Sequence, residues 1–285
     1  MTAEPPFFTD LDGVRRRHRA ALHAGKADRL REVAIAVSMV ALAGVALWSL
    51  EFSFARIWNG LGRLSEFAVL MLPPSYGTEA RLLIYLKALG ETLAIAFLGT
   101  FSAAILAFPL AFLAARNVTA SRIVRFCSRR FFDTIRGVDT LIWALIWINV
   151  VGLGPFAGVL AILTSDFGTF GKLFSEAIET SDGRAVEGVV AAGGGQTHAV
   201  RFGVLPQVLP LIASQVLYYF ESNTRSATII GIVGAGGIGL HLSEQIRTLE
   251  WQTVSFLILL ILVTVAVIDW ISSRLRISII GQRPS

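Results

Sequence analysis

Residues Thr92–Ala115 read TLAIAFLGTFSAAILAFPLAFLAA, a stretch without a charged side chain. A helix crosses a bilayer core about 30 Å thick with roughly 20 mostly apolar residues, so this stretch is long enough to span a membrane. Small residues are spaced along it, and they would let neighbouring helices approach closely. The stretch therefore predicts a membrane-spanning helix.

The composition of the whole chain agrees with a membrane protein. Of its 285 residues, 54% are hydrophobic and 16% are charged, whereas an ordinary soluble domain has about 45–50% and about 25%. A water-soluble enzyme is therefore not expected. The same length criterion finds six spans, the fourth of them interrupted by Asp166, and predicts an all-α polytopic membrane protein. The predicted spans are 33–50, about 92–115, about 138–151, one beginning near 156, about 210–233, and 254–268.

The basic residues set the expected topology. With the N-terminus inside, 19 of the 25 Lys and Arg residues fall on the cytoplasmic side, so the positive-inside rule places both termini in the cytoplasm. This accounts for the net charge of +5 without nucleic-acid binding, because no basic cluster is interleaved with stacking aromatics. The expected divisions are a basic cytoplasmic segment 1–32, a first span 33–50, an extracytoplasmic loop 51–91 with apolar residues at helical spacing over 54–72, a core 92–271, and a cytoplasmic tail 272–285.

Several catalytic and cofactor motifs are absent or incomplete. Gly234–Gly239 matches the dinucleotide fingerprint G-x-G-x-x-G, but no second strand ending in an acidic residue follows it. We expect these glycines instead to end the fifth span and turn the chain. The phosphate loop, H-E-x-x-H and G-x-S-x-G are missing, and Cys127 is the only cysteine. No catalytic residue, metal site or cofactor is therefore expected in this chain, and any ATP that drives it must be hydrolysed elsewhere.

One cytoplasmic connection has an unusual pattern. Residues 186–206 read VEGVVAAGGGQTHAVRFGVLP, which predicts a helix broken by consecutive glycines and a short helix that ends before Pro206. Such a bent element would project from the membrane. An ordinary amphipathic loop is the alternative on composition alone.

The spacing in this connection resembles a known signature. Glu187, Gly193 and Leu205-Pro206 are in register with the E-A-A-x-x-x-G-x9-I-x-L-P pattern of ABC importer permeases, although Gly188, Val189 and Gly203 depart from it. The stretches ETLAIAFLGT, PLAFLAARN, GLGPFAGVLA, GKLFSEAIE, RFGVLPQVLP and SATIIGIVGAGGIG resemble the permease subunits of phosphonate-type ABC importers, over roughly residues 91–270. The first 90 residues carry little of this resemblance.

The resemblance implies a fold, partners and a location. It implies a type I importer core of five helices plus an extra N-terminal helix, and a homodimer in the bacterial cytoplasmic (inner) membrane. Two ATPase subunits would bind ATP and Mg²⁺, an external binding protein would deliver substrate, and the substrates would be alkylphosphonates, phosphite or phosphate. The segment 176–206 would dock into the ATPase. The expected coupling residues are Glu187, Gly193, Gly194, Gly195, Arg201, Leu205 and Pro206.

A charged residue in the fifth predicted span suggests a substrate path. Arg225 lies roughly 22 Å along a helix from Pro210, where an unpaired charge costs about 2.5–3.5 kcal/mol. An internal pair with Glu221, four residues earlier, is one explanation. The other is that the planar guanidinium offers donors to a transiting anion. The candidate path residues are Arg225, Glu221, Ser222, Asn223, Thr224 and, more weakly, Asn149.

Two other functions compete with an ABC permease. An ion-coupled secondary transporter of a small anion would use Glu221 and Arg225 as its coupling pair, but the sequence lacks a two-fold hydropathy repeat. An intramembrane enzyme or a membrane scaffold is the third possibility, and no nucleophile and base recommend the enzyme.

Overall fold

The computed structural model describes residues 26–119 and 121–281, and every regular element in these ranges is a helix. Most of the expected cytoplasmic segment 1–32, and the last residues of the expected tail 272–285, lie outside the described residues. The chain divides into two units, residues 1–66 and residues 67–285.

The described part of the first unit begins with α3 (Lys26–Ser49), followed by α4 (Phe54–Leu70), which continues past the unit boundary. The span predicted at 33–50 falls almost wholly within α3, and residues 30–49 are long and apolar enough to cross a membrane. None of these residues is buried, which fits a helix surrounded by lipid. The helix expected within 54–72 is confirmed as α4. Its location at the membrane interface stays a prediction.

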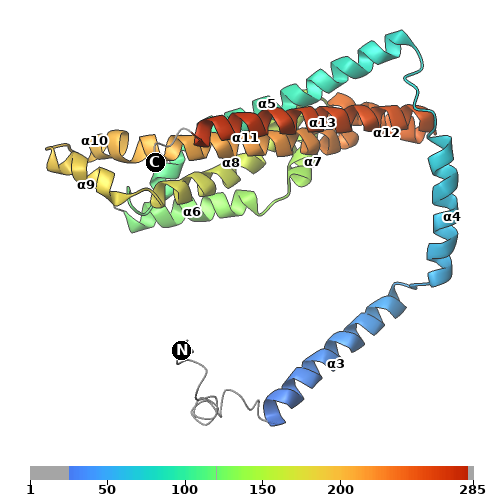
Figure 1. Cartoon of the computed structure of the whole chain (residues 1–285), viewed down its shortest axis with the longest axis horizontal. Helices are drawn as coiled ribbons and strands as arrows, with labels where there is room; N and C mark the ends of the chain where they lie inside the picture. Colours follow the sequence, from blue (N-terminus) through green and yellow to red (C-terminus); the bar gives the residue numbers. More distant parts are fainter. Residues whose placement is uncertain (1–25, 120, 282–285) are drawn as a thin grey trace, which may run out of the picture. The chain divides into compact units, whose positions relative to one another are not determined.

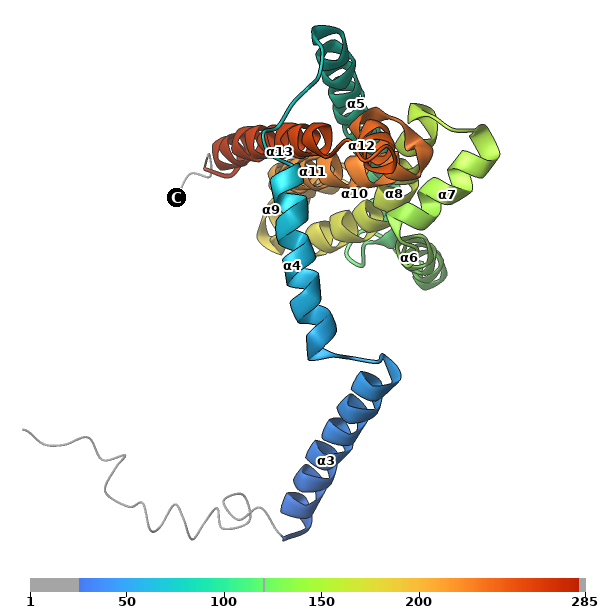
Figure 2. The ribbon, with the colours of Figure 1, turned by 90° about the vertical axis from the view of Figure 1, so that its right-hand side faces the viewer.

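The second unit is a helical bundle, drawn lengthwise in Figure 1. Its long helices are α5 and α8, which pack closely together, and α11 and α13, which pack on each other. Figure 2 shows α13 and the pair α6–α7 on opposite sides of α8 and α11. The helices are α5 (Glu79–Ala114), α6 (Arg122–Arg136), α7 (Thr140–Val151), α8 (Pro155–Glu179), α9 (Gly183–Ala191), α10 (Gln196–His198), η1 (Ala199–Val204), α11 (Leu205–Ile230), η2 (Gly231–Ala235), α12 (Gly237–Arg247) and α13 (Trp251–Ile280).

Small side chains bring α5 and α8 together, as expected from the sequence of the second predicted span. Ala103, Ala107 and Ala111 of α5 are completely buried. A Cβ atom on Gly99 would lie 2.7 Å from the side chain of Ile162 on α8, so no larger residue fits there without movement. Close helix contact through small residues is how membrane helices gain packing energy without a hydrophobic driving force.

The number of spans differs from the six that were predicted. Among the described residues, four helices are long and apolar enough to cross a membrane, or five if α6 and α7 count as one bent span. The third predicted span forms the short helix α7, which is bent by 85° from α6. The fourth predicted span is α8, whose apolar character is interrupted by Asp166 and Lys172. The six-span count is therefore not confirmed.

The glycines after the fifth predicted span turn the chain back into the bundle. Gly234 has φ of 111° and Gly236 has φ of 81°, both in the left-handed region that favours glycine. The hydroxyl of Thr92 on α5 accepts the backbone N–H of Ile238 at 2.8 Å and so holds the start of α12. A packed turn therefore explains this sequence, as expected, rather than a nucleotide site.

Candidate functional site

The connection that the sequence predicts to be cytoplasmic forms a hairpin of two helical arms, which we define as residues 182–206 and call the coupling hairpin. The first arm is α9, whose N-terminus is capped by Asp182, with Oδ1 accepting the N–H of Arg184 at 3.0 Å. An aspartate at this position satisfies a backbone donor that the helix leaves free. The second arm is α10 and η1, which lead into α11.

Glycines form the tip of the hairpin. Gly193 has φ of 86°, and its N–H donates to the carbonyl of Val190 at 2.9 Å. The N–H of Gly194 donates to the carbonyl of Val189, also at 2.9 Å. These two bonds are a Schellman motif, the helix ending that places a left-handed residue just after the cap. A Cβ atom on Gly194 would lie 2.8 Å from that same carbonyl oxygen, so the tip requires glycine at both positions.

The second arm does not end before Pro206, and this part of the prediction is wrong. Residues 196–235 form one helical stretch, which has a kink at Gly234 just before its end. Residues Ala199–Val204 are π-helical, and the N–H of Leu205 donates to Val200, five residues back. The wider turn accommodates the missing N–H of Pro206, which stands in the first turn of α11.

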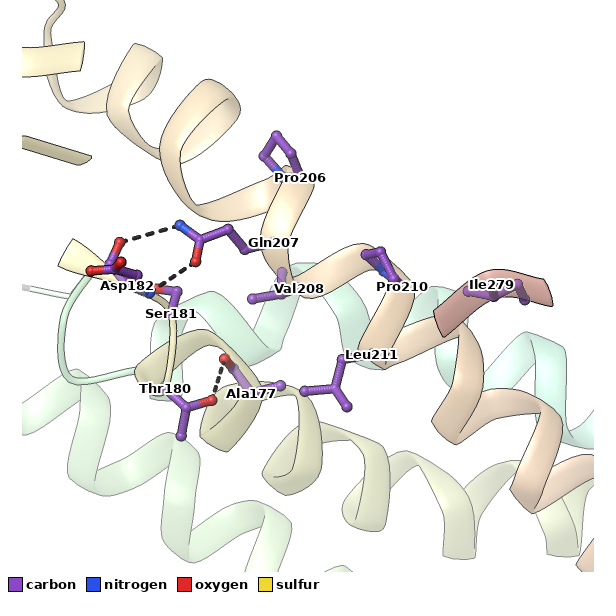
Figure 3. Close-up of a pocket in the computed structure, with 10 residues that line it drawn as sticks. All are labelled: Ala177, Thr180, Ser181, Asp182, Pro206, Gln207, Val208, Pro210, Leu211 and Ile279. Atoms are coloured by element: carbon purple, nitrogen blue, oxygen red, sulfur yellow. Dashed lines mark hydrogen bonds between the residues drawn. The ribbon is translucent and has the colours of Figure 1, made fainter. Parts of the chain in front are cut away.

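Gln207 ties the two ends of the hairpin together. Its Oε1 accepts the N–H of Asp182 at 2.9 Å, and its Nε2 donates to the carbonyls of Asp182 at 3.2 Å and Gly203 at 2.7 Å. Figure 3 shows this side chain bridging α11 and the start of α9. Beside it lies a cavity of about 560 Å³, which Pro206, Pro210 and Ile279 also line.

The departure from the signature at Gly203 has a packing explanation. A Cβ atom on Gly203 would lie 3.0 Å from the Cα of Val186 in the opposite arm. The arms therefore approach more closely here than the bulky aliphatic residue of the signature would allow. The signature is altered at this position, but the hairpin it describes is present.

The outer surface of the hairpin is exposed and carries both charged and aromatic side chains. Glu187 and Arg201 are exposed, and among the described residues neither forms an ion pair. The Arg201 guanidinium lies 5.4 Å from the centre of the Phe202 ring, which is itself 57% exposed. Exposed aromatic and arginine side chains are typical of a protein contact surface.

A buried polar cluster joins three core helices. Asn223 of α11 donates through Nδ2 to Thr100 of α5 at 2.8 Å and to Asp166 of α8. All three residues are buried. The amide of Asn223 is therefore engaged within the protein, and so is the hydroxyl of Thr224, which donates to the carbonyl of Phe220 at 3.0 Å.

A second cluster contains the predicted pair of charges. Arg225 Nη1 lies 3.6 Å from Glu221 Oε1, and Arg276 of α13 donates through Nη2 to Glu221 Oε2 at 3.1 Å. The Glu221 side chain is 9% exposed, whereas that of Arg225 is 49% exposed. Ser222 is half-buried on the same helix. Asn149 lies apart on α7, and its amide donates to the carbonyl of Leu145 at 2.7 Å.

Sequence reasoning missed four residues of these clusters. Asp166 gave a signal, since it is a carboxylate inside a predicted span. Arg276 was counted only among the topology residues, and Thr100 and Gln207 gave no signal. Their roles come from partners far away in the chain, which a sequence pattern does not show.

Comparison with known proteins identifies the family. Residues 107–277 match the family of binding-protein-dependent transport system inner membrane components. The chain belongs to this family. It is thus a multi-pass component of the inner membrane, as its spans and expected location predicted.

Two relatives of this inner membrane component come from Stutzerimonas stutzeri and carry phosphite transport system permease in their names. HtxC is 39% identical over 257 residues, which cover 90% of each chain. PtxC is 35% identical over 249 residues, which cover 87% of this chain and 88% of PtxC.

A solved structure of the MetNI methionine ABC transporter, in an inward facing conformation, has a similar chain. The TM-score is 0.62 at 17% identity, covering 71% of this chain and 99% of that one. At this identity the likeness is one of fold, and it covers that chain of the transporter almost completely.

Proposed function

We propose that this inner membrane component is the translocation subunit of an ABC importer for phosphorus oxyanions such as phosphite, alkylphosphonates or phosphate. The substrate class is supported by its likeness to HtxC and PtxC over most of their length. The chain itself would be no enzyme and bind no cofactor, while ATP and Mg²⁺ would be bound by a partner ATPase. The observation that supports this proposal most directly is the helical stretch 196–235, which joins the coupling hairpin to the membrane core.

The proposed assembly follows from the type I importer core. Two copies of this chain would pair as a homodimer, each with six spans and cytoplasmic termini and with α3 as the extra N-terminal helix. Two ATPase subunits would bind the coupling hairpins, and an external binding protein would deliver the oxyanion. The proposed contacts with the ATPase come from the hairpin and its base, at Glu187, Gly193, Gly194, Gly195, Arg201, Leu205 and Pro206.

The proposed substrate path runs beside Arg225. Among the candidate residues on α11, Arg225 is the most exposed, and its guanidinium matches the geometry of phosphoryl oxygens. Asn223 and Thr224 are buried and donate their hydrogen bonds to acceptors within the chain, and the amide of Asn149 donates to the carbonyl of Leu145. They would therefore contribute to the path by shaping it.

Co-purification of the ATPase with tagged full-length chain tests the docking surface. Glu187→Lys reverses a charge on the exposed hairpin and is expected to reduce ATPase recovery about tenfold. Glu250→Lys makes the same charge change at the exposed N-terminal end of α13 and serves as the control. Equal recovery with both variants would count against the docking role.

Uptake into proteoliposomes tests the importer itself. The reconstituted assembly, supplied with its binding protein, should accumulate radiolabelled phosphite or phosphate only with ATP, and competition by methylphosphonate would define the class. An ion-coupled secondary transporter would instead respond to an imposed proton or sodium gradient without ATP. ATP-independent uptake that an ionophore abolishes would favour that alternative.

A further inference from the structure

Arg276 connects α13 to the charged residues of α11. It is separated from Glu221 by 55 positions in the sequence, yet its guanidinium donates to Oε2 of that carboxylate at 3.1 Å. The same guanidinium lies 5.8 Å from the centre of the Tyr218 ring, one turn before Glu221 on α11. Arg225 approaches the other carboxylate oxygen. Glu221 is thus held between two guanidinium groups from two helices.

The charges in this cluster do not balance. Two guanidinium groups share one carboxylate, and among the described residues neither arginine forms an ion pair with another acid. Arg225 is 3.6 Å from its carboxylate oxygen, beyond normal hydrogen-bond length. Its side chain is half-exposed, so several of its five donors stay available. The cluster therefore carries one excess positive charge and unused donors.

We propose that Arg225 and Arg276 form a two-arginine oxyanion site, in which a transiting phosphorus oxyanion exchanges with the Glu221 carboxylate. This inference rests on the proposed function. A guanidinium binds carboxylate and phosphoryl oxygens with the same planar fork, so Glu221 and the oxyanion compete for the same donors. The carboxylate therefore weakens oxyanion binding and takes over both arginines when the oxyanion leaves. A site on a transport path needs this weak binding.

A purely structural tie between α11 and α13 is the competing explanation. Such a tie would need Arg276 and Glu221 but not Arg225, and it would be weakened whenever Glu221 loses its charge. The oxyanion site predicts the opposite effect for Glu221, because removal of the competing carboxylate frees both guanidinium groups. The sign of the Glu221 effect therefore separates the two explanations.

Phosphate binding to the full chain in phosphatidylcholine nanodiscs tests the site directly, with the inorganic phosphate ³¹P resonance as the readout. Arg276→Gln and Arg225→Gln should each raise the half-saturating phosphate concentration about tenfold. Glu221→Gln should lower it severalfold. Arg274→Gln is the matched control, since Arg274 lies on the same helix but its guanidinium is over the Trp270 ring, and it should have no effect. Equal binding by the Arg274 and Arg276 variants, or no saturable binding by the wild-type chain, would overturn the proposal.

A lipid phosphate group could occupy the same two arginines. Adding phosphatidylglycerol to the nanodiscs is expected to leave the half-saturating concentration of free phosphate unchanged. Loss of phosphate binding in these nanodiscs would show that a lipid headgroup fills the pair, and would overturn a role in transport.

Uptake by the reconstituted assembly gives the second measurement. Arg276→Gln should reduce the maximal rate of phosphate uptake about tenfold, and the Arg274→Gln control should retain it. The double variant Glu221→Gln with Arg276→Gln keeps a neutral hydrogen-bonding pair, so full recovery of uptake in it would indicate a structural tie and overturn the site. If the wild-type assembly transports no phosphorus oxyanion, the proposed function fails. If the wild-type assembly transports it and the Arg276 variant does so equally well, only the two-arginine site is contradicted.

Discussion

Gly193 holds the tip of the coupling hairpin in a backbone conformation that other residues adopt only with strain. Because φ is 86° at this position, replacing the glycine with alanine is expected to lower the free energy of unfolding by about 1–2 kcal/mol. A Cβ atom there would meet no other atom within 4 Å, so the whole effect comes from the backbone. We therefore expect Gly193→Ala to lower the melting temperature of the chain in detergent. In the reconstituted assembly, it should reduce the amount of substrate taken up per ATP hydrolysed.

Gly188 provides the control for this prediction. It lies in α9 of the same hairpin, is not among the proposed ATPase contacts, and a Cβ atom there would also meet no other atom within 4 Å. Gly188→Ala is expected to transport normally. Equal losses in the two alanine variants would show that side-chain volume on the hairpin, and not the left-handed backbone, is what matters.

Asn223 is the only described side chain that donates a hydrogen bond to the buried carboxylate of Asp166. Asn223→Leu removes this donor and is expected to destabilise the chain by about 1–3 kcal/mol, the cost of a buried polar group left unpaired. Adding Asp166→Leu removes the unpaired group and should recover part of that loss. Thermal unfolding of the three variants in detergent measures the difference, and additive losses would show that the two residues are not coupled.

Only some residues of the candidate sites could be predicted from the sequence. Glu187, Gly193 and Pro206 could be found because their spacing within one hairpin is visible in the sequence. The pairing of Glu221 with Arg225 could be found because helical residues four apart share a face. Arg276 could not be assigned to Glu221, because its position depends on how α13 packs on α11.

At the scale of elements, Gln207 links the start of α11 to the start of the hairpin through its hydrogen bonds with Asp182. Gln207→Ala removes two hydrogen bonds to Asp182 that join the two ends of the hairpin, and a third to Gly203 one turn earlier, each worth about 0.5–1.5 kcal/mol. We expect ATPase subunits still to co-purify with this variant, because the docking surface is intact, but uptake per ATP hydrolysed should fall severalfold.

Gln196 is the matched control for Gln207. Its amide reaches only the carbonyl of Val118, at 3.5 Å, and it is exposed. Uptake per ATP hydrolysed should be normal in the Gln196→Ala variant. Full coupling in the Gln207 variant as well would show that the hairpin is held rigid by backbone packing alone.

The elements themselves were predicted unevenly. Long apolar stretches gave α3, α5, α11 and α13, because a membrane helix needs only length and hydrophobicity. The bend between α6 and α7 was not predicted, because the arginine-rich residues 122–136 were interpreted as part of a connection between spans and not as a helix. The end of the second hairpin arm was placed wrongly at Pro206, because a π-helical turn can absorb a proline and a sequence pattern gives no sign of one.

At the scale of the whole molecule, the chain has a membrane core and a separate N-terminal unit. Because the two units are compact separately, we expect the core to fold without α3. A variant that begins at residue 50 is expected to keep the thermal stability of the full chain within about 1 kcal/mol. Unfolding measurements in detergent check this, and a loss of several kcal/mol would show that α3 is part of the core.

The helical stretch 196–235 has a mechanical consequence. Forty residues rise about 60 Å, so a tilt of about 10° at one end displaces the other by about 10 Å. This length exceeds the thickness of a bilayer core, about 30 Å, so a movement of the hairpin would be carried across the membrane along one element. A glycine with positive φ precedes the stretch at Gly193, and another kinks it near its other end at Gly234. The direction in which these two turns yield would decide which side of the membrane opens.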